Sequence, residues 1–337
     1  MRQELGQIMS EATAFMKSRI ILTAVELDLF TRIHESPAGL PELARQMAFD
    51  KRAMTRLLDC LVTLGFLEKQ DGLYRVSEEG KFLSSHHPET LLPAVRHMAF
   101  VWDGWNKLTH VIKNGPDLQR KPIEDQLSER QVDSFLGAMH TIARDLSREV
   151  AEFYDAGAYK RLLDIGGGAG TYTIAFLEKN LHMQGVIFDM ENVIPTTRET
   201  IQKAGLGDRV ELVAGDFYSD ELPSGCDMAL LSAIIHQNSP GQNVELYAKI
   251  YRALNRGGVI LIRDHIMDES RTKPVDGTLF AVNMLVLTPG GDTYTFEEVK
   301  ETLETAGFTG VKWIRVGERM DSLIEAIKSD NGLSGPY

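Results

Sequence analysis

RLLDIGGGAG, at residues 161–170, is the stretch of sequence that decides the fold. Residues 161–165 form an apolar, strand-like run, which leads directly into a loop with glycine at positions 166, 167, 168 and 170. We expect a helix to follow over residues 170–180. A buried strand, a glycine loop and a helix in this order are typical of a ligand-binding turn in an α/β protein.

On the C-terminal side of this stretch, strand-like and helix-like segments alternate. We expect strands over residues 185–188, 209–213, 227–231 and 258–262, helices over 194–204, 243–254 and 296–306, and two last strand-like runs over 311–316 and 322–327. This alternation predicts an α/β fold with a doubly wound, mostly parallel sheet. Ligands of such sheets bind beyond the carboxyl ends of the strands, so the acidic residues at those ends are the first candidates for a site.

On the N-terminal side, the first hundred residues predict helices and one small hairpin. Helices are expected over residues 18–29, 39–47 and 51–64, followed by short strands at 66–68 and 73–76 around the turn Gln70-Asp71-Gly72. Helix, helix and hairpin form the winged-helix pattern. The next segment, 88–153, is helical and rich in aromatic residues and methionine, which either fill a core or line the pocket of a flat aromatic substrate.

Bulk properties narrow the function. The 337 residues carry a formal net charge of −12, and a field of that sign disfavours nucleic acid as a partner. Cys60 and Cys226 stand far apart without metal-ligand spacing, which predicts neither a disulfide framework nor a metal site. The chain shows no signal peptide and no membrane-spanning apolar run, so we expect a cytoplasmic protein without a membrane partner.

The glycine loop does not fit a dinucleotide fingerprint, because the third glycine position falls on Thr171 or Thr173. Glycines still let the backbone approach a ligand, and the helix N-terminus offers free N–H groups to a carboxylate such as that of a methionine moiety. Asp189, at the end of the next strand, can accept both hydroxyls of a ribose. Asp216 and Phe217, after the third strand, suit an adenine amine and its ring. The set predicts a nucleoside site.

Five motifs carry a family resemblance: LLDIGGGAG (162–170), VIFDMENVI (186–194), VAGDFY (213–218), GGVILIRD (257–264) and NMLVLTPGG (283–291). The chain resembles class I S-adenosylmethionine-dependent O-methyltransferases of the plant caffeic acid and bacterial antibiotic-pathway type. The resemblance covers nearly the whole chain. It implies S-adenosyl-L-methionine as cofactor, a Rossmann-like methyltransferase sheet whose last strand is antiparallel, and a homodimer formed through the N-terminal winged-helix domain.

The resemblance also implies a domain plan. We expect a dimerisation domain over residues 1–100, a helical connector over 101–155 that contributes to the substrate pocket, a catalytic domain over 156–330 and a flexible tail over 331–337.

The family's cofactor contacts map onto Gly166, Gly168, Asp189, Asp216 and Phe217, and we add Asp164, Gly170, Met190 and Ser232 to the expected cofactor site. The family's catalytic histidine falls on His236, and the acid that supports it falls on Asp264. Three departures stand out: the family's His-Asp-Trp is His236-Gln237-Asn238, a lysine frequent in plant enzymes is Ser232, and a second supporting glutamate is Thr293.

These residues predict methylation of a hydroxyl, expected to be phenolic, on a small, planar, largely apolar molecule. A histidine with a pKa near 6.5 can accept the proton of a phenol as the new bond forms, and Asp264 can fix its tautomer. His265 is a second, weaker candidate for the base. We expect the pocket to be lined by Phe100, Trp102, Trp105, Phe135, Met139, Phe280, Asn283 and Met284.

Other functions stay open at this point. The same fold and cofactor can serve N- or C-methylation, cyclisation or decarboxylation. A metal-dependent catechol mechanism has only Asp264 and Asn238 as candidate ligands, too few for magnesium. A DNA-binding regulator would use Lys51, Arg52 and Arg56 on the recognition helix, but acidic residues surround them: Glu42, Asp50 and Asp59.

Overall fold

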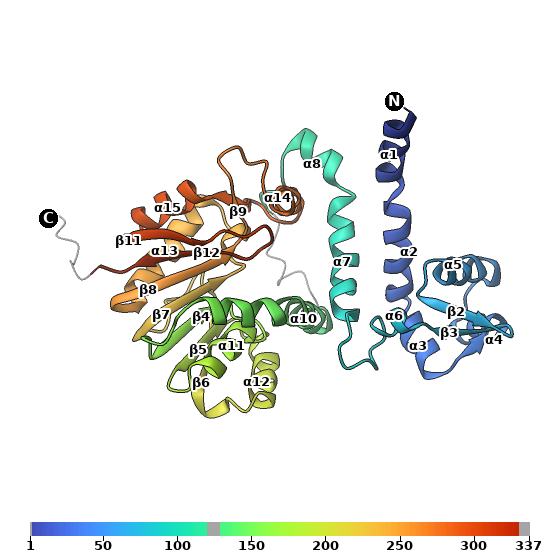
Figure 1. The fold of residues 1–337 in the computed structure, drawn as a ribbon, viewed down its shortest axis with the longest axis horizontal. Helices are drawn as coiled ribbons and strands as arrows, with labels where there is room; N and C mark the ends of the chain where they lie inside the picture. The colour runs from blue at the N-terminus through green and yellow to red at the C-terminus, as the bar shows by residue number, and fades with distance from the viewer. Residues whose placement is uncertain (1, 120–128, 330–337) are drawn as a thin grey trace. The chain divides into compact units, whose positions relative to one another are not determined.

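The computed structural model describes residues 2–119 and 129–329 (Figure 1). The chain divides into two compact units, Met1–Asp103 and Gly104–Tyr337. The expected tail over residues 331–337 lies outside the described residues. Within the described ranges, no helix is both long and apolar enough to span a bilayer.

The first unit is helical with one small antiparallel sheet, as the sequence predicts. Its helices are α1 (Arg2–Thr13), α2 (Phe15–Glu26), α3 (Leu29–Glu35), α4 (Leu40–Met47), α5 (Lys51–Thr63), α6 (Glu78–Lys81) and most of α7 (Leu92–Trp105). The hairpin strands β2 (Leu67–Gln70) and β3 (Leu73–Val76) are joined by β1 (Ala38–Gly39), which the sequence analysis missed, in the order β1-β3-β2.

Local sequence explains the ends of these helices. The Asp50 carboxylate caps α5 by accepting the Ala53 N–H at 2.7 Å, and Met54, Leu58 and Leu61 bury one face of the helix. The single helix expected over residues 18–29 is wrong at its C-terminal end. Asp28 adopts a left-handed conformation, with φ of 56°, so α2 ends before it and α3 begins after it.

The second unit begins with helices and contains the main sheet. The helical segments are the end of α7, then α8 (Leu108–Asn114) and α10 (Glu129–Phe153). The seven-stranded sheet has the order β11-β12-β8-β7-β4-β5-β6. Its strands are β4 (Arg161–Ile165), β5 (Gln184–Asp189), β6 (Val210–Ala214), β7 (Cys226–Ser232), β8 (Leu254–Asp264), β11 (Thr309–Arg315) and β12 (Ser322–Ile327).

This sheet confirms the predicted fold class. Strands β8, β7, β4, β5 and β6 are mutually parallel, and the last strand, β12, is antiparallel to both β11 and β8. The order reverses at β4, which lies between β7 and β5, so the connections on its two sides leave toward opposite faces.

Helices cover both faces of the sheet (Figure 1). One face packs on α10, α11 (Thr171–Lys179) and α12 (Ile194–Lys203), with Leu162, Leu230 and Leu261 among its buried residues. The other face packs on α13 (Pro240–Ala253) and α15 (Phe296–Thr305), with Leu163, Leu231 and Ile262 among its buried residues. Side chains alternate along each strand, so neighbouring residues at a strand end serve different faces.

Three further elements complete the unit, and the sequence analysis did not anticipate them. Strands β9 (Ile266–Met267) and β10 (Tyr294–Thr295) form a small parallel pair, and α14 (Val275–Leu287) lies between them in the chain. The β9–β10 pair brings the segment after β8 beside the segment before α15.

Candidate active site

The glycine loop connects β4 to α11 in a backbone conformation that excludes most side chains. Gly166 and Gly168 have φ values of +64° and +55°, in the left-handed region. A Cβ added at Gly166 would lie 2.6 Å from the Cδ1 atom of Ile234, which follows β7. The loop therefore presents bare backbone at the carboxyl edge of the sheet.

Asp189, at the end of β5, is tied to this loop. One of its carboxylate oxygens accepts the Gly168 N–H at 2.7 Å, and the other accepts the Met190 N–H at 2.7 Å. Met190 in turn packs against a small apolar cluster of Val132, Leu136 and Val193. The carboxylate is thus held in one orientation between the ends of β4 and β5.

Asp164 lies inside the protein beneath the same loop. Its carboxylate is almost fully buried and accepts the Thr173 hydroxyl at 2.7 Å. Burial raises the pKa of Asp164 to about 6, with the charge of Asp189 adding to the rise and the Thr173 hydroxyl opposing it. A strongly perturbed acid beside a bare loop is a mark of a functional site.

Asp216 and Phe217 follow β6. The Asp216 carboxylate accepts the Tyr218 N–H at 2.8 Å, and the Lys249 ammonium donates to the Phe217 carbonyl at 2.9 Å. The Phe217 ring reaches the glycine loop: its Cε1 atom is 3.7 Å from the position a Cβ would take at Gly166. The structure therefore brings the predicted loop, acids and aromatic ring together along one edge.

His236 and Asp264 meet on the other side of the reversal point. His236 lies in a short 3-10 turn after β7, and Asp264 ends β8. The His236 Nδ1 atom is 2.9 Å from each oxygen of the Asp264 carboxylate, which is fully buried. This pair is the arrangement expected from the sequence.

Electrostatics favour a charged Asp264. Burial acts to raise the pKa of Asp264, but His236, Arg263 and the His265 N–H together hold it below its ordinary value. An ionised carboxylate accepts a hydrogen bond, which assigns the proton of the neutral imidazole to Nδ1. Nε2 is then the atom of His236 that can accept a proton.

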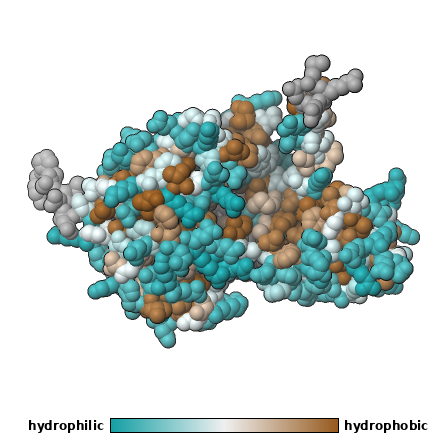
Figure 2. All heavy atoms as spheres, in the orientation of Figure 1, coloured by the Kyte–Doolittle hydropathy of each residue, from teal (hydrophilic) through white to brown (hydrophobic). Residues whose placement is uncertain are grey.

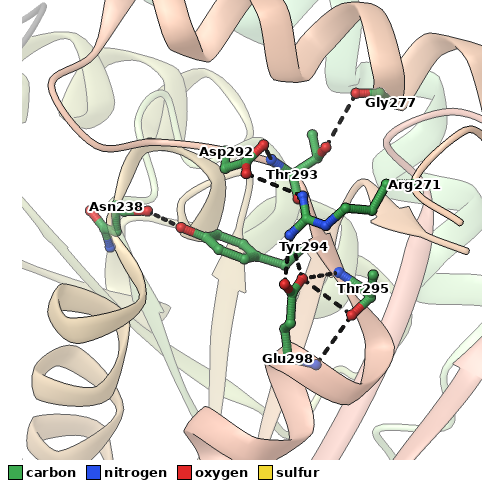
Figure 3. A network of polar contacts seen from close by, with 8 residues as sticks. All are labelled: Asn238, Arg271, Gly277, Asp292, Thr293, Tyr294, Thr295 and Glu298. Atoms are coloured by element: carbon green, nitrogen blue, oxygen red, sulfur yellow. Dashed lines mark hydrogen bonds and ion pairs between the residues drawn. The ribbon is translucent and has the colours of Figure 1, made fainter. Parts of the chain in front are cut away.

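Asn238, one of the departures that follow His236, helps to anchor the loop that carries it. The Tyr218 hydroxyl lies 2.5 Å from Asn238 Oδ1. The Tyr294 hydroxyl donates to the Asn238 carbonyl (Figure 3). The Asp292 N–H also donates to the His236 carbonyl at 2.9 Å. Backbone and loop contacts thus fix the position of the imidazole.

The Thr293 hydroxyl makes its hydrogen bond to α14. It donates to the Gly277 carbonyl on that helix at 3.3 Å (Figure 3). The neighbouring Arg271 guanidinium binds Glu298 at 2.6 and 2.7 Å and Asp292 at 3.1 Å, which holds the segment after β9 against the start of α15.

Four of the predicted substrate residues gather in the second unit. The Phe280 ring lies edge-on to the His236 ring at 4.8 Å and 5.1 Å from the His265 ring. One turn further along α14, the Asn283 side-chain oxygen accepts the Trp105 indole N–H at 2.8 Å. Met284 follows and is buried. The predicted pocket wall is therefore partly assembled on α14.

The other predicted substrate residues lie elsewhere. Phe100 and Trp102 belong to the first unit, where Phe100 stacks on His97 and the Arg19 guanidinium lies over the Trp102 ring. Met139 is half-buried on α10. The Phe135 side chain lies outside the described residues. A pocket role for these four remains a prediction.

Two polar side chains at the same edge, those of Arg263 and Tyr172, were not assigned by the sequence analysis. Ser232 does not stand alone, because its hydroxyl accepts the Arg263 Nε–H at 2.7 Å. The Tyr172 hydroxyl and the His265 Nδ1 atom are buried and make no hydrogen bond of good geometry within the described residues. The sequence did hold a signal for Arg263. Side chains alternate along β8, so Arg263 and Asp264 lie on opposite faces of the sheet at the end of the strand where the ligand is expected.

Comparison with known proteins identifies two family models that this sequence matches. Residues 123–309 match the model of an O-methyltransferase domain, and residues 9–85 match that of an O-methyltransferase dimerisation domain. The chain is 32% identical over 311 residues to a 3-hydroxy-5-methyl-1-naphthoate 3-O-methyltransferase of Streptomyces sahachiroi, covering 90% of this chain and 89% of that protein.

Two further proteins extend the likeness. The tetracenomycin polyketide synthesis 8-O-methyl transferase TcmO of Streptomyces glaucescens is 29% identical, over 91% of this chain and 92% of its own length. A solved structure described as PigF with SAH superposes with a TM-score of 0.87 at 25% identity, covering 96% of this chain and 99% of that chain.

Proposed function

Because this chain belongs to the O-methyltransferase family, we propose that it transfers a methyl group from S-adenosyl-L-methionine to a phenolic hydroxyl of a small, planar, largely apolar molecule. The observation that carries the proposal is the buried pair of His236 and Asp264, joined at 2.9 Å, at the edge where the glycine loop also lies. At the carboxyl edge of the sheet, the ends of β4, β5 and β6 fit a nucleoside donor, and the ends of β7 and β8 fit the removal of a proton from the acceptor.

The glycine loop fits the donor because its backbone is accessible. A Cβ at Gly168 would touch only Leu136, at 3.6 Å, so the backbone there approaches open space. The backbone of Gly166 and Gly168 would hold the donor, Asp189 its ribose hydroxyls, and Asp216 with Phe217 its adenine. When bound, S-adenosyl-L-methionine supplies a methyl group on a sulfonium, which is an already activated donor.

The chain's own residues then align the acceptor and move one proton. As the oxygen–methyl bond forms, the methyl–sulfur bond of the donor would break and leave a neutral thioether, while the phenolic O–H bond breaks and its proton passes to Nε2 of His236. Asp264 stabilises the resulting imidazolium, because its carboxylate lies 2.9 Å from Nδ1. Phe280 places apolar surface beside the imidazole, and Met284 is buried one turn further along α14, which favours a flat, apolar acceptor.

The test is methyl transfer to a panel of naphthols, hydroxynaphthoates and polyketide phenols, with products identified by mass spectrometry. We expect His236→Ala to reduce turnover by about 10²-fold or more, the usual contribution of a positioned base. His182→Ala, at an exposed histidine, is the matched control. If His236→Ala keeps full turnover on the acceptor preferred by the wild type, His236 is not the base.

We also propose that the first unit forms a homodimer, and the match to a dimerisation-domain model supports this. Large apolar side chains are exposed along α1 and α2: Leu5, Ile8, Met9, Phe15 and Met16. Figure 2 shows hydrophobic residues gathered over α2 and α7 on the displayed face. Such a patch is typical of a protein–protein interface.

The oligomeric state can be measured by light scattering on a sizing column. We expect a dimer for the wild type and a monomer for the double variant Ile8→Glu with Met16→Glu. Leu118→Glu changes an even more exposed apolar residue, which belongs to the second unit, and should leave the dimer intact. A monomeric wild type at micromolar concentration would refute the dimer.

A further inference from the structure

Arg263 is a buried arginine whose hydrogen-bond partners are neutral. Only 6% of its surface is exposed. Its Nε–H donates to the Ser232 hydroxyl at 2.7 Å and one Nη–H donates to the Met320 carbonyl at 2.5 Å. Within the described parts of the chain, no carboxylate lies within ion-pair distance of this guanidinium, unlike that of Arg271, which binds Glu298 and Asp292.

Asp164 and Asp264 are near enough for the charge of Arg263 to lower their pKa values, but neither carboxylate forms an ion pair with the guanidinium, and a buried cation without a direct ion-pair partner is costly. Removing a charged group from water costs several kcal/mol unless an opposite charge and further hydrogen bonds compensate. The guanidinium has five N–H donors, and Ser232 and Met320 engage two of them. The Tyr172 ring lies 4.9 Å beneath it, which stabilises the cation without neutralising it. The remaining donors suit an anionic ligand.

Tyr172 gives a second, independent observation. Tyr172 is only 6% exposed, and its hydroxyl makes no hydrogen bond of good geometry within the described residues, although the Ser232 hydroxyl lies near enough to lower the pKa of the phenol. Burial raises the pKa of this phenol, although Arg263 and Ser232 oppose the rise, so the hydroxyl remains a neutral donor. Buried polar atoms are rarely left unpaired, so this one also points to a ligand.

The strand register places these groups beside the glycine loop. Ser232 pairs with Arg263, and Leu231 pairs with Ile165, so Ser232 lies level with Gly166. Tyr172 is in the first turn of α11, directly after the loop. All three groups therefore reach the carboxyl edge of the sheet at the point where the donor is proposed to bind.

The same face also carries an acid. Side chains alternate along strands, and Asp164 and Arg263 extend the rows of Leu162 and Leu261, which pack on α10 and α11. Arg263 and Asp164 thus lie on the same face of the sheet at its carboxyl edge. An amino acid carries one carboxylate and one ammonium, and these charges are complementary to Arg263 and Asp164, respectively.

We infer that Arg263, with Tyr172 and Ser232, forms the subsite for the carboxylate of the donor's methionine half. The inference rests on the proposed function and adds residues to its donor site. A planar guanidinium can give two parallel hydrogen bonds to a carboxylate, and the Tyr172 hydroxyl can give a third. Bound ligand would then supply the direct ion-pair partner that Arg263 lacks among the described residues.

Calorimetric titration with two ligands tests this subsite. One ligand is S-adenosylhomocysteine, and the other is its decarboxylated analogue, which keeps the nucleoside and the amine. Hydrogen bonds to a charged group that only one ligand can make should favour S-adenosylhomocysteine about 10- to 100-fold on the wild type. Arg263→Met should lose this preference and bind the decarboxylated ligand as the wild type does.

Two further variants sharpen the result. Tyr172→Phe should weaken S-adenosylhomocysteine about 3- to 10-fold and leave the analogue unchanged. Arg256→Met, at an exposed arginine on the same strand, is the matched control and should change neither affinity. If Arg263→Met fails to fold, the ligand preference of the wild type and its change in Tyr172→Phe decide the question.

The outcomes separate the two proposals. A wild type that binds neither ligand overturns the proposed donor site and this subsite with it. A wild type that binds both ligands equally overturns the carboxylate subsite alone. So does an Arg263→Met protein that keeps the preference, or one that loses affinity for both ligands to the same extent, because the role of Arg263 is then structural.

Discussion

Asp164→Asn should stabilise the ligand-free protein at alkaline pH and leave its stability unchanged at acidic pH. The buried carboxyl has its pKa raised from 3.8 to about 6. Because the folded-state pKa is raised, protonation favours the folded state. The stabilisation from the protonated form is fully present below 3.8 and is lost as the pH rises through about 6.

The size of the effect follows from that pKa. The rise to about 6 corresponds to about 3 kcal/mol of folding free energy at pH 8, because one pKa unit equals about 1.4 kcal/mol. Asparagine resembles the protonated acid in shape and can still accept the Thr173 hydroxyl, so it should recover most of this energy. For a unit of this size that is a rise of about 6–12 °C in melting temperature.

The assay is thermal unfolding of the ligand-free wild type and Asp164→Asn at several values between pH 4.5 and 8. The difference in melting temperature should be largest at pH 8 and shrink steadily below pH 6. Thr173→Val, which removes the hydroxyl that opposes the pKa rise, should destabilise the protein most at pH 8. A difference that is independent of pH, or an asparagine variant less stable at pH 8, would refute the reasoning.

Three more substitutions test other parts of the site. Asp264→Asn removes the acceptor that keeps the His236 proton on Nδ1, so turnover should fall by about 10²-fold or more while S-adenosylhomocysteine still binds in a titration. Gly166→Ala places a Cβ 2.6 Å from Ile234 and should weaken S-adenosylhomocysteine at least about 10-fold, with Ile234→Ala partly restoring it. Trp105→Phe removes the 2.8 Å bond to Asn283 and should raise KM for the acceptor about 5-fold without changing donor affinity, whereas a changed donor affinity would contradict the assignment of α14 to the acceptor.

The sheet, and the edge of it at which the ligand is expected to bind, were predictable because the apolar strand segments and the glycine loop are visible in short stretches of sequence. Strand β12 has the bounds expected from its sequence, and β4 is followed by the glycine loop as predicted. Asp189, Asp216 and Asp264 each end or follow a strand, so a parallel sheet necessarily brings them to one edge.

Other features depend on tertiary contacts that sequence periodicity does not encode. Helix α14 carries apolar residues on all sides, so no polar face signals it. The break between α2 and α3 depends on the left-handed Asp28, whose carboxylate is bound by Arg96 at 3.2 Å. The loss of a lysine at Ser232 was visible, but the guanidinium that reaches this point comes from the neighbouring strand, 31 residues away.

The position of β4 in the strand order has a consequence for how such proteins diversify. The proposed contacts to the donor's nucleoside half begin at the reversal point and lie on β4, β5 and β6, whereas the base and the proposed carboxylate subsite lie on β7, β8 and the first turn of α11. Helix α14, which contributes no strand to the sheet, provides the wall beside the base. Substitutions on α14 can therefore change the range of acceptors while the binding of the donor stays constant. That separation makes α14 the segment to exchange between relatives when a new acceptor preference is to be engineered.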